Sequence, residues 1–430
     1  MVKNWSNIPI RDVTIKVKHF DPKKEPIEFK YIDVSSVDRE SLTVKYSKYI
    51  LSKQAPSRAR QRLKKNDVII ATVRPTLKRI AYINDDYDNA ICSTGFCVLR
   101  PISKVIDSEF LYYSIQRESF NEGLGSLQKG ASYPAVSDKD VKSQIILLPP
   151  LSEQKKIAAV LSTIQQAREK TEAVIEAAKQ VKQSMMKHLF TYGPVPVSEA
   201  DQVELKETEI GEIPKDWAIK KLSDIFDFSR KPRSVKTKPD DKVPFIPMEL
   251  IPENGVEVTW KEKMVREITS GTYVERGDLI IGKITPCFEN GKQAILNNLP
   301  SSFGYATTEV WAIHPKAGIS INSRLIHEFL KQPHIRNELA SKMEGATGRQ
   351  RLPRYVLQDL LIPTPPEKTQ QKMVNTIIAI DQKISSETAK KEALDTLFKS
   401  MLEQLITGKV RVVDLDIEIP EDATDHQTAE

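Results

Sequence analysis

The sequence predicts an α+β protein in which two mixed α/β domains stand in tandem, each followed by a long helix. The two helices are expected to pair as an antiparallel coiled coil. Three observations predict this fold: an internal repeat over almost the whole chain, two long segments without Gly or Pro, and strand-like runs confined to the first part of each repeat. Short apolar or alternating runs indicate strands, whereas apolar residues three and four apart indicate helices.

The internal repeat has a period of about 215 residues. Each copy opens on a Trp that is followed by an Asp and a β-branched residue, and the later motifs recur in the same order. The offset between matched positions drifts only between 211 and 216, which indicates a duplication. The matched segments are WSNIPIRDV (5–13) with WAIKKLSDI (217–225), KKNDVIIATVRP (64–75) with ERGDLIIGKITP (275–286), and STGFCVLRP (93–101) with TTEVWAIHP (307–315).

A long heptad helix follows the Pro-rich joint at the end of each domain. Ser152 is expected to be the N-cap of the first helix, and Gly408 ends the second. About 39 residues give a helix of ~58 Å, which is longer than a domain of about 150 residues can cover. Each helix therefore needs a partner, and its copy is favoured over the alternative of two ordinary core helices. The predicted seam of the first helix is Ile157, Val160, Ile164, Ala167, Thr171, Val174, Ala178, Val181 and Met185. That of the second is Met373, Ile377, Ile380, Ile384, Glu387, Lys391, Leu394, Phe398, Met401 and Leu405.

These signals divide the chain into five segments. The net charge of the chain is +6, but residues 414–430 hold seven acids and no Lys or Arg, so the rest is more basic than the total shows. A basic body suggests a polyanionic partner, although a merely basic soluble protein is the alternative. The predicted segments are the domains 1–150 and 194–366, the helices 151–193 and 367–408, and an acidic, disordered tail 409–430.

Basic residues gather in segments that are predicted to be loops in both domains. Arg can read guanine with two hydrogen bonds and Gln can read adenine, so these loops are candidates for contact with DNA. A solvated charged face is the alternative for any one run. Amide side chains near these loops include Gln61, Gln128 and Gln293. The predicted DNA-binding residues are Arg58, Arg60, Arg62, Lys64, Arg74, Lys78, Arg79, Arg230, Lys231, Arg233, Lys236, Lys283, Arg349, Gln350, Arg351 and Arg354.

Catalytic and metal-binding motifs are missing from the sequence. It has no GxGxxG after a strand, no GxxxxGK[ST], no HExxH, no GxSxG and no Asn-Pro-Pro-aromatic tetrapeptide. Six scattered His and three Cys without a CxxC pair favour neither a metal site nor a disulfide framework, and a reducing cytoplasm is expected. No stretch approaches the ~20 apolar residues of a membrane span. The chain is therefore expected to bind rather than catalyse, with no cofactor of its own.

Three segments carry a resemblance to a known family: LPPLSEQKKIAAVLSTI (148–164), IGEIPKDWAIKKLSDI (210–225) and IPTPPEKTQQKMVNTIIAID (362–381). With them the chain resembles the specificity subunit of type I restriction-modification systems. The resemblance implies two target recognition domains, each reading one half of a bipartite double-stranded DNA sequence. It also implies helices that set the spacer and hold two methyltransferase subunits, which carry S-adenosylmethionine. A restriction or motor subunit is a further possible partner.

Several apolar residues fall outside the predicted seams. A coiled coil leaves such residues as neighbours of the domains or as a binding surface. Because the resemblance places methyltransferase subunits against the helices, these residues are predicted to bind them. They are Leu161, Ile175, Leu189, Ile378, Leu397 and Leu402. The alternatives to a DNA-recognition subunit are a coiled-coil scaffold and a DNA-acting enzyme with unrecognised catalytic motifs.

Overall fold

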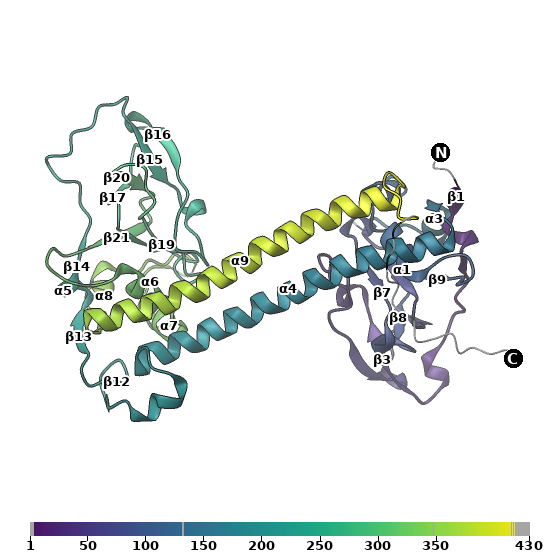
Figure 1. Ribbon diagram of the computed structural model, residues 1–430, viewed down its shortest axis with the longest axis horizontal. Coiled ribbons are helices and arrows are strands. Elements are labelled where there is room, and N and C mark those ends of the chain that lie inside the picture. The colour runs from purple at the N-terminus through teal and green to yellow at the C-terminus, as the bar shows by residue number, and fades with distance from the viewer. Residues whose placement is uncertain (1–3, 131–132, 347, 414, 416, 418–430) are drawn as a thin grey trace. The chain divides into compact units, whose positions relative to one another are not determined.

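A computed structural model of the chain describes residues 4–130, 133–346, 348–413, 415 and 417. The chain forms two compact units (Figure 1). Unit 1 comprises Met1–Ala173 and Thr388–Glu430, and unit 2 comprises Val174–Glu387. Each unit holds one α/β domain and one half of each long helix, α4 (Leu151–Tyr192) and α9 (Glu367–Ile406). A unit is therefore built from parts of the chain that are far apart in sequence.

The domain of unit 1 contains two four-stranded sheets and a two-stranded ladder. Strand β3 pairs with β8 in parallel, and the other pairs in these sheets are antiparallel. In spatial order the sheets are β2 (Thr14–Ile15), β9 (Phe96–Pro101), β6 (Val68–Ala71), β7 (Ile80–Tyr82), and β4 (Lys48–Leu51), β3 (Glu28–Ile32), β8 (Ile91–Ser93), β5 (Ala59–Arg62). The ladder joins β1 (Ser6–Pro9) to β10 (Ile145–Leu148), and the helices are α1 (Ser108–Ser114), α2 (Glu118–Ser126) and α3 (Asp138–Ser143).

The domain of unit 2 repeats this topology strand for strand. Its sheets are β14 (Phe226–Phe228), β21 (Val310–Pro315), β18 (Leu279–Gly282), β19 (Gln293–Ile295), and β16 (Lys261–Met264), β15 (Lys242–Ile246), β20 (Phe303–Ala306), β17 (Thr272–Glu275). The ladder joins β13 (Ala218–Lys221) to β22 (Leu361–Thr364), and a small pair joins β11 (Leu205–Lys206) to β12 (Ile213–Pro214). The helices are α5 (Leu222–Ile225), α6 (Ser323–Lys331), α7 (Pro333–Ser341) and α8 (Arg354–Gln358). The predicted fold class is confirmed.

The repeated Asp before each central strand has a structural role. Asp67 and Asp278 are fully buried at the turns that lead into β6 and β18. Asp67 accepts two hydrogen bonds from Arg100 of β9, at 2.8 and 2.7 Å. Asp278 lies 2.7 Å from Nδ1 of His314, the matching residue of β21. These paired carboxylates fix the turn against the neighbouring strand in both units.

The Gln that the two helix joints share is also structural. Gln154 Nε2 donates to the carbonyls of Pro149 and Val105, and its Oε1 accepts from the backbone N–H of Asp107. Gln370 does the same with Pro365, Ser320 and Asn322. In each unit one buried amide therefore ties the start of a long helix to the start of a short helix of the domain, as the duplication requires.

The long helices pair antiparallel within each unit (Figure 1). In unit 1 Arg168 Nε of α4 lies 2.6 Å from Asp395 Oδ1 of α9, and in unit 2 Lys182 Nζ of α4 lies 2.8 Å from Asp381 Oδ1 of α9. The first half of one helix thus meets the second half of the other. Helix α4 begins at Leu151, so the expectation that Ser152 is its N-cap is wrong: Ser152 lies inside the first turn.

The predicted seam of α4 is wrong at Val174 and Val181. The buried or half-buried row there lies one residue later, on a line of residues that recurs every seven positions, at Leu161, Arg168, Ile175, Lys182 and Leu189. Val174 and Val181, which were expected in the seam, are 42% and 55% exposed. Two charged residues take seam positions because acids on other elements neutralise them, which the local apolar pattern does not show.

The ends of the long helices complete the cores of the domains. Unit 1 buries Phe398, Leu402, Leu405, Ile406 and Val412 with its domain, and unit 2 buries Met186, Leu189, Phe190, Met373, Val374 and Ile377.

The expected disorder of the tail is wrong for residues 409–413. Val412 is 2% exposed, and Arg411 forms a bidentate ion pair with Glu153, which is 2% exposed and also accepts from Trp5 Nε1 at 3.0 Å. Residues 414, 416 and 418–430, where the rest of the acidic tail was expected, lie outside the described residues.

Among the residues that the structure describes, no helix is long and apolar enough to cross a membrane.

Candidate DNA interface

In unit 1 the loop after β6 meets the segment between α2 and α3. The backbone N–H of Arg74 donates to the carbonyl of Pro134 at 2.7 Å, and that of Val136 donates to Thr72 at 2.9 Å. Arg74 and Lys78 both have left-handed backbones, with φ of 48° and 51°. Non-glycine residues pay for this conformation, so its recurrence at two cations of one short loop points to a functional role.

An aromatic ring accompanies this loop. The guanidinium carbon of Arg74 lies 5.3 Å from the ring centroid of Tyr133, and Tyr133 is 73% exposed. A cation stacked on an exposed ring is well suited to contact with nucleic acid. Sequence reasoning singled out Arg74 and missed Tyr133, although an aromatic residue beside a basic loop is a signal that was available.

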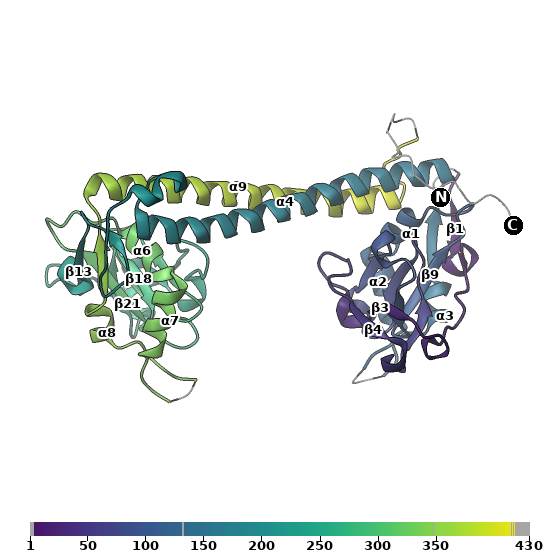
Figure 2. The same cartoon turned by 90° about the horizontal axis from the view of Figure 1, so that it is seen from below.

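In unit 2 the matching loops meet in the same way. The N–H of Thr285 donates to the carbonyl of Gln350 at 3.0 Å, and the N–H of Leu352 donates to that of Lys283 at 2.7 Å. Lys283 Nζ lies 4.3 Å from the ring centroid of Trp311, and burial lowers the pKa of Lys283. The loop between α7 and α8, which carries exposed Arg349, projects away from α4 and α9 (Figure 2). Both units therefore present a composite basic loop surface.

Six of the predicted DNA-binding cations are exposed and make neither an ion pair nor a contact with an aromatic ring within the described part of the chain. Such side chains can give all their charge to a partner. They are Arg58, Lys64, Arg230, Arg233, Lys236 and Arg349.

Other predicted cations are engaged inside the protein. The pairs are Arg60 with Asp21 at 3.3 Å, Arg62 with Glu25 at 3.1 Å, Lys78 with Glu118, and Arg351 with Glu309 at 2.8 Å. Lys231 and Arg354 stack over the rings of Tyr305 and Phe228 at 6.0 and 4.1 Å.

Arg79 has a clear structural role. Its guanidinium donates to the carbonyls of Val34, Ser35 and Val37, so it holds a turn of the domain. Two of the amides near the basic loops are likewise internal. Gln61 Nε2 donates to the carbonyls of Ser93 and Phe96, and Gln293 is fully buried. The expectation that these two amides are available to bases is therefore wrong, whereas Gln350 stays a candidate.

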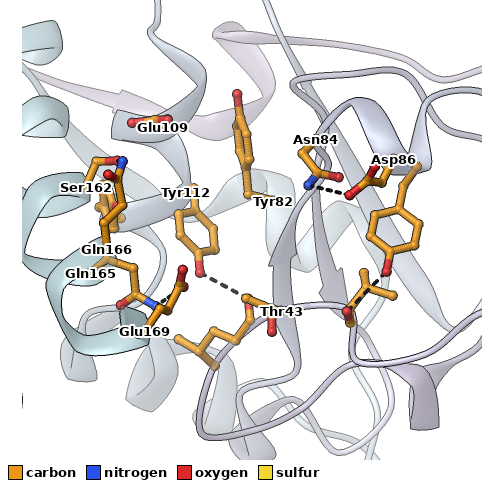
Figure 3. A pocket seen from close by; sticks show the side chains of 14 residues that line it. Thr43, Tyr82, Asn84, Asp86, Glu109, Tyr112, Ser162, Gln165, Gln166 and Glu169 are labelled. Atoms are coloured by element: carbon orange, nitrogen blue, oxygen red, sulfur yellow. Dashed lines mark hydrogen bonds between the residues drawn. The ribbon is translucent and has the colours of Figure 1, made fainter. Parts of the chain in front are cut away.

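A cleft of about 460 Å³ lies between the domain of unit 1 and α4 (Figure 3). Tyr82, Tyr112, Glu109, Asp86 and Glu169 are among its 14 lining residues, and none of the 14 is Lys or Arg. Its charge is opposite to that of the basic loops. The cleft is therefore not part of the candidate DNA interface.

The predicted partner-binding residues divide into buried and exposed ones. Leu161, Leu189 and Leu402 belong to the cores, and Ile175 is 4% exposed, so the expectation that these four face outward is wrong. Ile378 and Leu397 are 40% and 44% exposed.

Sequence reasoning missed Val181, which it placed in the seam. It is 55% exposed and lies 216 positions before Leu397, so the two occupy the same place in the repeat. The two long helices thus carry one exposed apolar residue at matching positions.

Within the described residues no group of three or more His, Cys, Asp or Glu could hold a metal ion.

The chain matches the family described as the type I restriction modification DNA specificity domain over residues 2–180 and 214–396. Among its relatives, the type I restriction enzyme MjaVIII specificity subunit of Methanocaldococcus jannaschii is 27% identical over 343 residues, which cover 76% of each chain. The putative MjaX specificity subunit of the same organism is 22% identical over 431 residues, which cover 95% of this chain and 94% of that one.

Two solved structures share the fold. The S subunit of a type I restriction-modification system from M. genitalium has a TM-score of 0.55 at 17% identity, over 94% of this chain and 96% of that one. A chain from work on complex assembly and conformational transition of the type I R-M system has a TM-score of 0.58 at 23% identity, over 95% and 100%. Because the family match covers both copies of the repeat, the chain belongs to the type I restriction-modification specificity subunits, the non-catalytic DNA-recognition components of these systems.

Proposed function

We propose that each α/β domain reads one half of a bipartite DNA sequence through its composite basic loops. The observation that carries this proposal is the repetition of the loop arrangement. In both units the loop after the central strand is hydrogen-bonded to the loop before the last short helix, and both loops carry cations. Two equivalent readers in one chain suit a target with two half-sites.

The contacts that the cations make inside the protein suggest two roles, phosphate contact and base recognition. Exposed cations that lack an ion pair and lie outside the two hydrogen-bonded loops, such as Arg58 and Arg233, suit phosphate contact, which supplies affinity without sequence information. The backbones of Arg74 and Gln350 are held by hydrogen bonds between two loops, and a side chain on a fixed backbone suits base recognition better than one on a mobile loop. We assign Arg74 and Tyr133 to the first half-site and Arg349 and Gln350 to the second.

A domain exchange tests this function. Residues 1–150 are replaced by the corresponding segment of a relative, and the methylated sequence is determined by methylome sequencing of the host. We expect one half of the recognised sequence to change and the other half to remain. A change in both halves would contradict independent readers. Point variants sharpen the test, because Arg349→Ala should lose about 1–3 kcal/mol of discrimination at one base pair of the second half-site only.

We propose that the paired helices hold two methyltransferase subunits, which supply S-adenosylmethionine and the methyl transfer. Val181 and Leu397 support this, because an exposed apolar residue recurs at the same place of both helices. Two equivalent surfaces suit two copies of one partner. The three free cysteines and the expected work on DNA support the cytoplasm as the compartment.

A stoichiometry measurement tests this docking. Val181→Asp and Leu397→Asp are each mixed with the methyltransferase subunit, and the masses of the complexes are measured. We expect each single variant to lose about thirtyfold in affinity at one position, equivalent to ~2 kcal/mol, and the double variant to lose both subunits. Gln180→Asp puts the same charge on an adjacent exposed position and should change nothing. Unchanged assembly of the double variant would refute this surface.

A further inference from the structure

Four charged side chains from three helices meet at the base of the domain of unit 2. Lys182 Nζ of α4 lies 2.8 Å from Asp381 Oδ1 of α9 and 3.3 Å from Glu328 Oε2 of α6. Arg324 Nη2 of α6 lies 2.8 Å from Glu328 Oε1 and also contacts Asp381. Lys182, Arg324, Glu328 and Asp381 are called the ion cluster below.

The ion cluster is largely buried and has no net charge. The exposed fractions of its side chains are 3% for Glu328, 14% for Arg324, 24% for Lys182 and 29% for Asp381. Burial opposes the ionisation of Glu328, but His327, Lys182 and Arg324 outweigh it and lower the pKa of Glu328 to about 2. Glu328 is therefore charged at neutral pH, and each of the four groups needs the others in place.

Polar contacts continue from the ion cluster to a basic loop. His327 Nδ1 lies 3.1 Å from Glu328 Oε1, and the carbonyl of His327 accepts from Gln293 Nε2 at 2.6 Å. Gln293 Oε1 accepts from Arg336, which also donates to the carbonyl of Phe288 at 3.2 Å. Phe288 lies in the loop after β18 that carries Lys283. An unbroken series of buried contacts thus joins both long helices to a loop of the candidate DNA interface.

Unit 1 has different residues at the repeat-equivalent positions. Lys182 corresponds to Phe398 at an offset of 216, and Glu328 corresponds to Tyr113 at an offset of 215. The rings of Phe398 and Tyr113 lie 6.0 Å apart at 63°. Aromatic packing is tolerant of small shifts, whereas a buried ion cluster has one arrangement in which every charge is paired. The ion cluster therefore gives unit 2 an attachment that unit 1 does not share.

We propose that the ion cluster is the positioning device of the second recognition domain. It fixes the direction in which that domain stands on α4 and α9, and so it restricts recognition to one spacer length between the half-sites. Lys182 is a positioning residue, because it is the member of the ion cluster that joins α4 to both carboxylates. This inference rests on the proposed reading of a bipartite DNA sequence.

The test uses the full chain assembled with its methyltransferase subunits. Methylation rates are measured on duplexes that carry both half-sites with the correct spacer or with one base pair more or less. In Lys182→Met we expect the rate on the wrong spacers, relative to the correct one, to rise about threefold to thirtyfold. Sequence preference within the first half-site should not change, and Lys182→Arg should retain the strict spacing because it keeps the charge.

Met186→Ala is the matched control. Met186 lies on α4 one turn after Lys182 and is 7% exposed in the core of unit 2. If this variant relaxes the spacing as much as Lys182→Met, loose packing is the cause and the proposal is wrong. Unchanged spacing in a folded Lys182→Met also refutes it. If Lys182→Met does not fold, Asp381→Asn keeps the shape of the cluster and answers the same question in the same assay.

The assay separates this inference from the proposed function. If the wild-type complex shows no preference for two half-sites, the proposed function fails. If the wild type reads both half-sites and Lys182→Met keeps the spacing, only the positioning role fails.

Discussion

Glu153 is a buried carboxylate of unit 1 whose loss should destabilise that unit. It is 2% exposed, accepts from Trp5 Nε1 at 3.0 Å, and pairs with Arg411 at 2.6 and 2.8 Å. It therefore joins the first strand region, the start of α4 and the segment after α9. In Glu153→Ala the indole N–H and the guanidinium lose this acceptor inside the protein.

The expected loss can be worked from these contacts. Removing one partner of a buried ion pair costs about 3–5 kcal/mol. The side chain of Arg411 is 32% exposed, so water recovers part of this, and we expect a loss of about 2–3 kcal/mol in the free energy of unfolding of unit 1. For a unit of about 200 residues this lowers the Tm by roughly 5–10 °C.

Differential scanning calorimetry of the full chain measures this loss, with Glu176→Gln as the control. Glu176 is exposed on the same helix and pairs with Lys179 at 2.7 Å, so its change should stay within about 0.5 kcal/mol. A double-mutant cycle with Arg411→Ala should give a coupling of at least ~1.5 kcal/mol. A loss under ~0.5 kcal/mol in Glu153→Ala, or additive single variants, would show that the contact carries little of the stability of unit 1.

Four further outcomes are expected. The pKa of Glu328 is lowered from 4.5 to about 2 in the folded protein, so the stability that it contributes is complete above about pH 4.5 and is lost as the pH falls toward 2. Acid unfolding followed by circular dichroism should show that Glu328→Gln lacks this pH dependence. Arg58→Ala should lower the slope of log affinity for DNA against log salt concentration by about 0.9. Arg62→Ala should lower it less, because Arg62 already pairs with Glu25. Equal slopes for the two variants in a filter-binding titration would contradict this division into available and engaged cations. Ile175→Asp should unfold or destabilise the chain rather than weaken assembly alone, because Ile175 is buried, and a stable variant by calorimetry would return it to the docking surface. Whole heptads inserted into both α4 and α9 should change the spacer length in a methylome assay and leave both half-sites unchanged, and an unaltered spacer would show that the helices do not set it.

The repeat made most of the fold predictable from the sequence. Central strands such as Val68–Ala71 and Leu279–Gly282 are apolar throughout because they are buried on both faces, so they stand out in both copies. The seam of α9 was also predictable, since Met373, Ile377, Phe398 and Leu405 are buried apolar residues at heptad spacing. Gln154 and Gln370 recur at the two helix joints because, in each unit, the same three backbone groups need a hydrogen-bond partner.

The seam of α4 could not be predicted in the same way. Local apolar periodicity assigns charged residues to the outside, yet Arg168 and Lys182 occupy inner positions. Their acids, Asp395 and Asp381, lie about 200 residues away in sequence and on another helix. Contacts between distant parts of the chain were equally unpredictable in the candidate interface. Composition identifies Arg79 as a cation in a loop, but only the folded chain shows the carbonyls to which it donates hydrogen bonds.

The distribution of the cores has a consequence for biosynthesis. Unit 2 is one continuous stretch, Val174–Glu387, whereas unit 1 needs Phe398, Leu402 and Val412 from near the end of the chain to cover its domain. A ribosome that makes the chain from its N-terminus therefore releases the complete unit 2 before unit 1 can close. The first domain stays incomplete, with an apolar surface exposed, during the synthesis of more than half the protein. A stop codon at residue 388 would thus leave unit 2 intact and damage the domain that was made first.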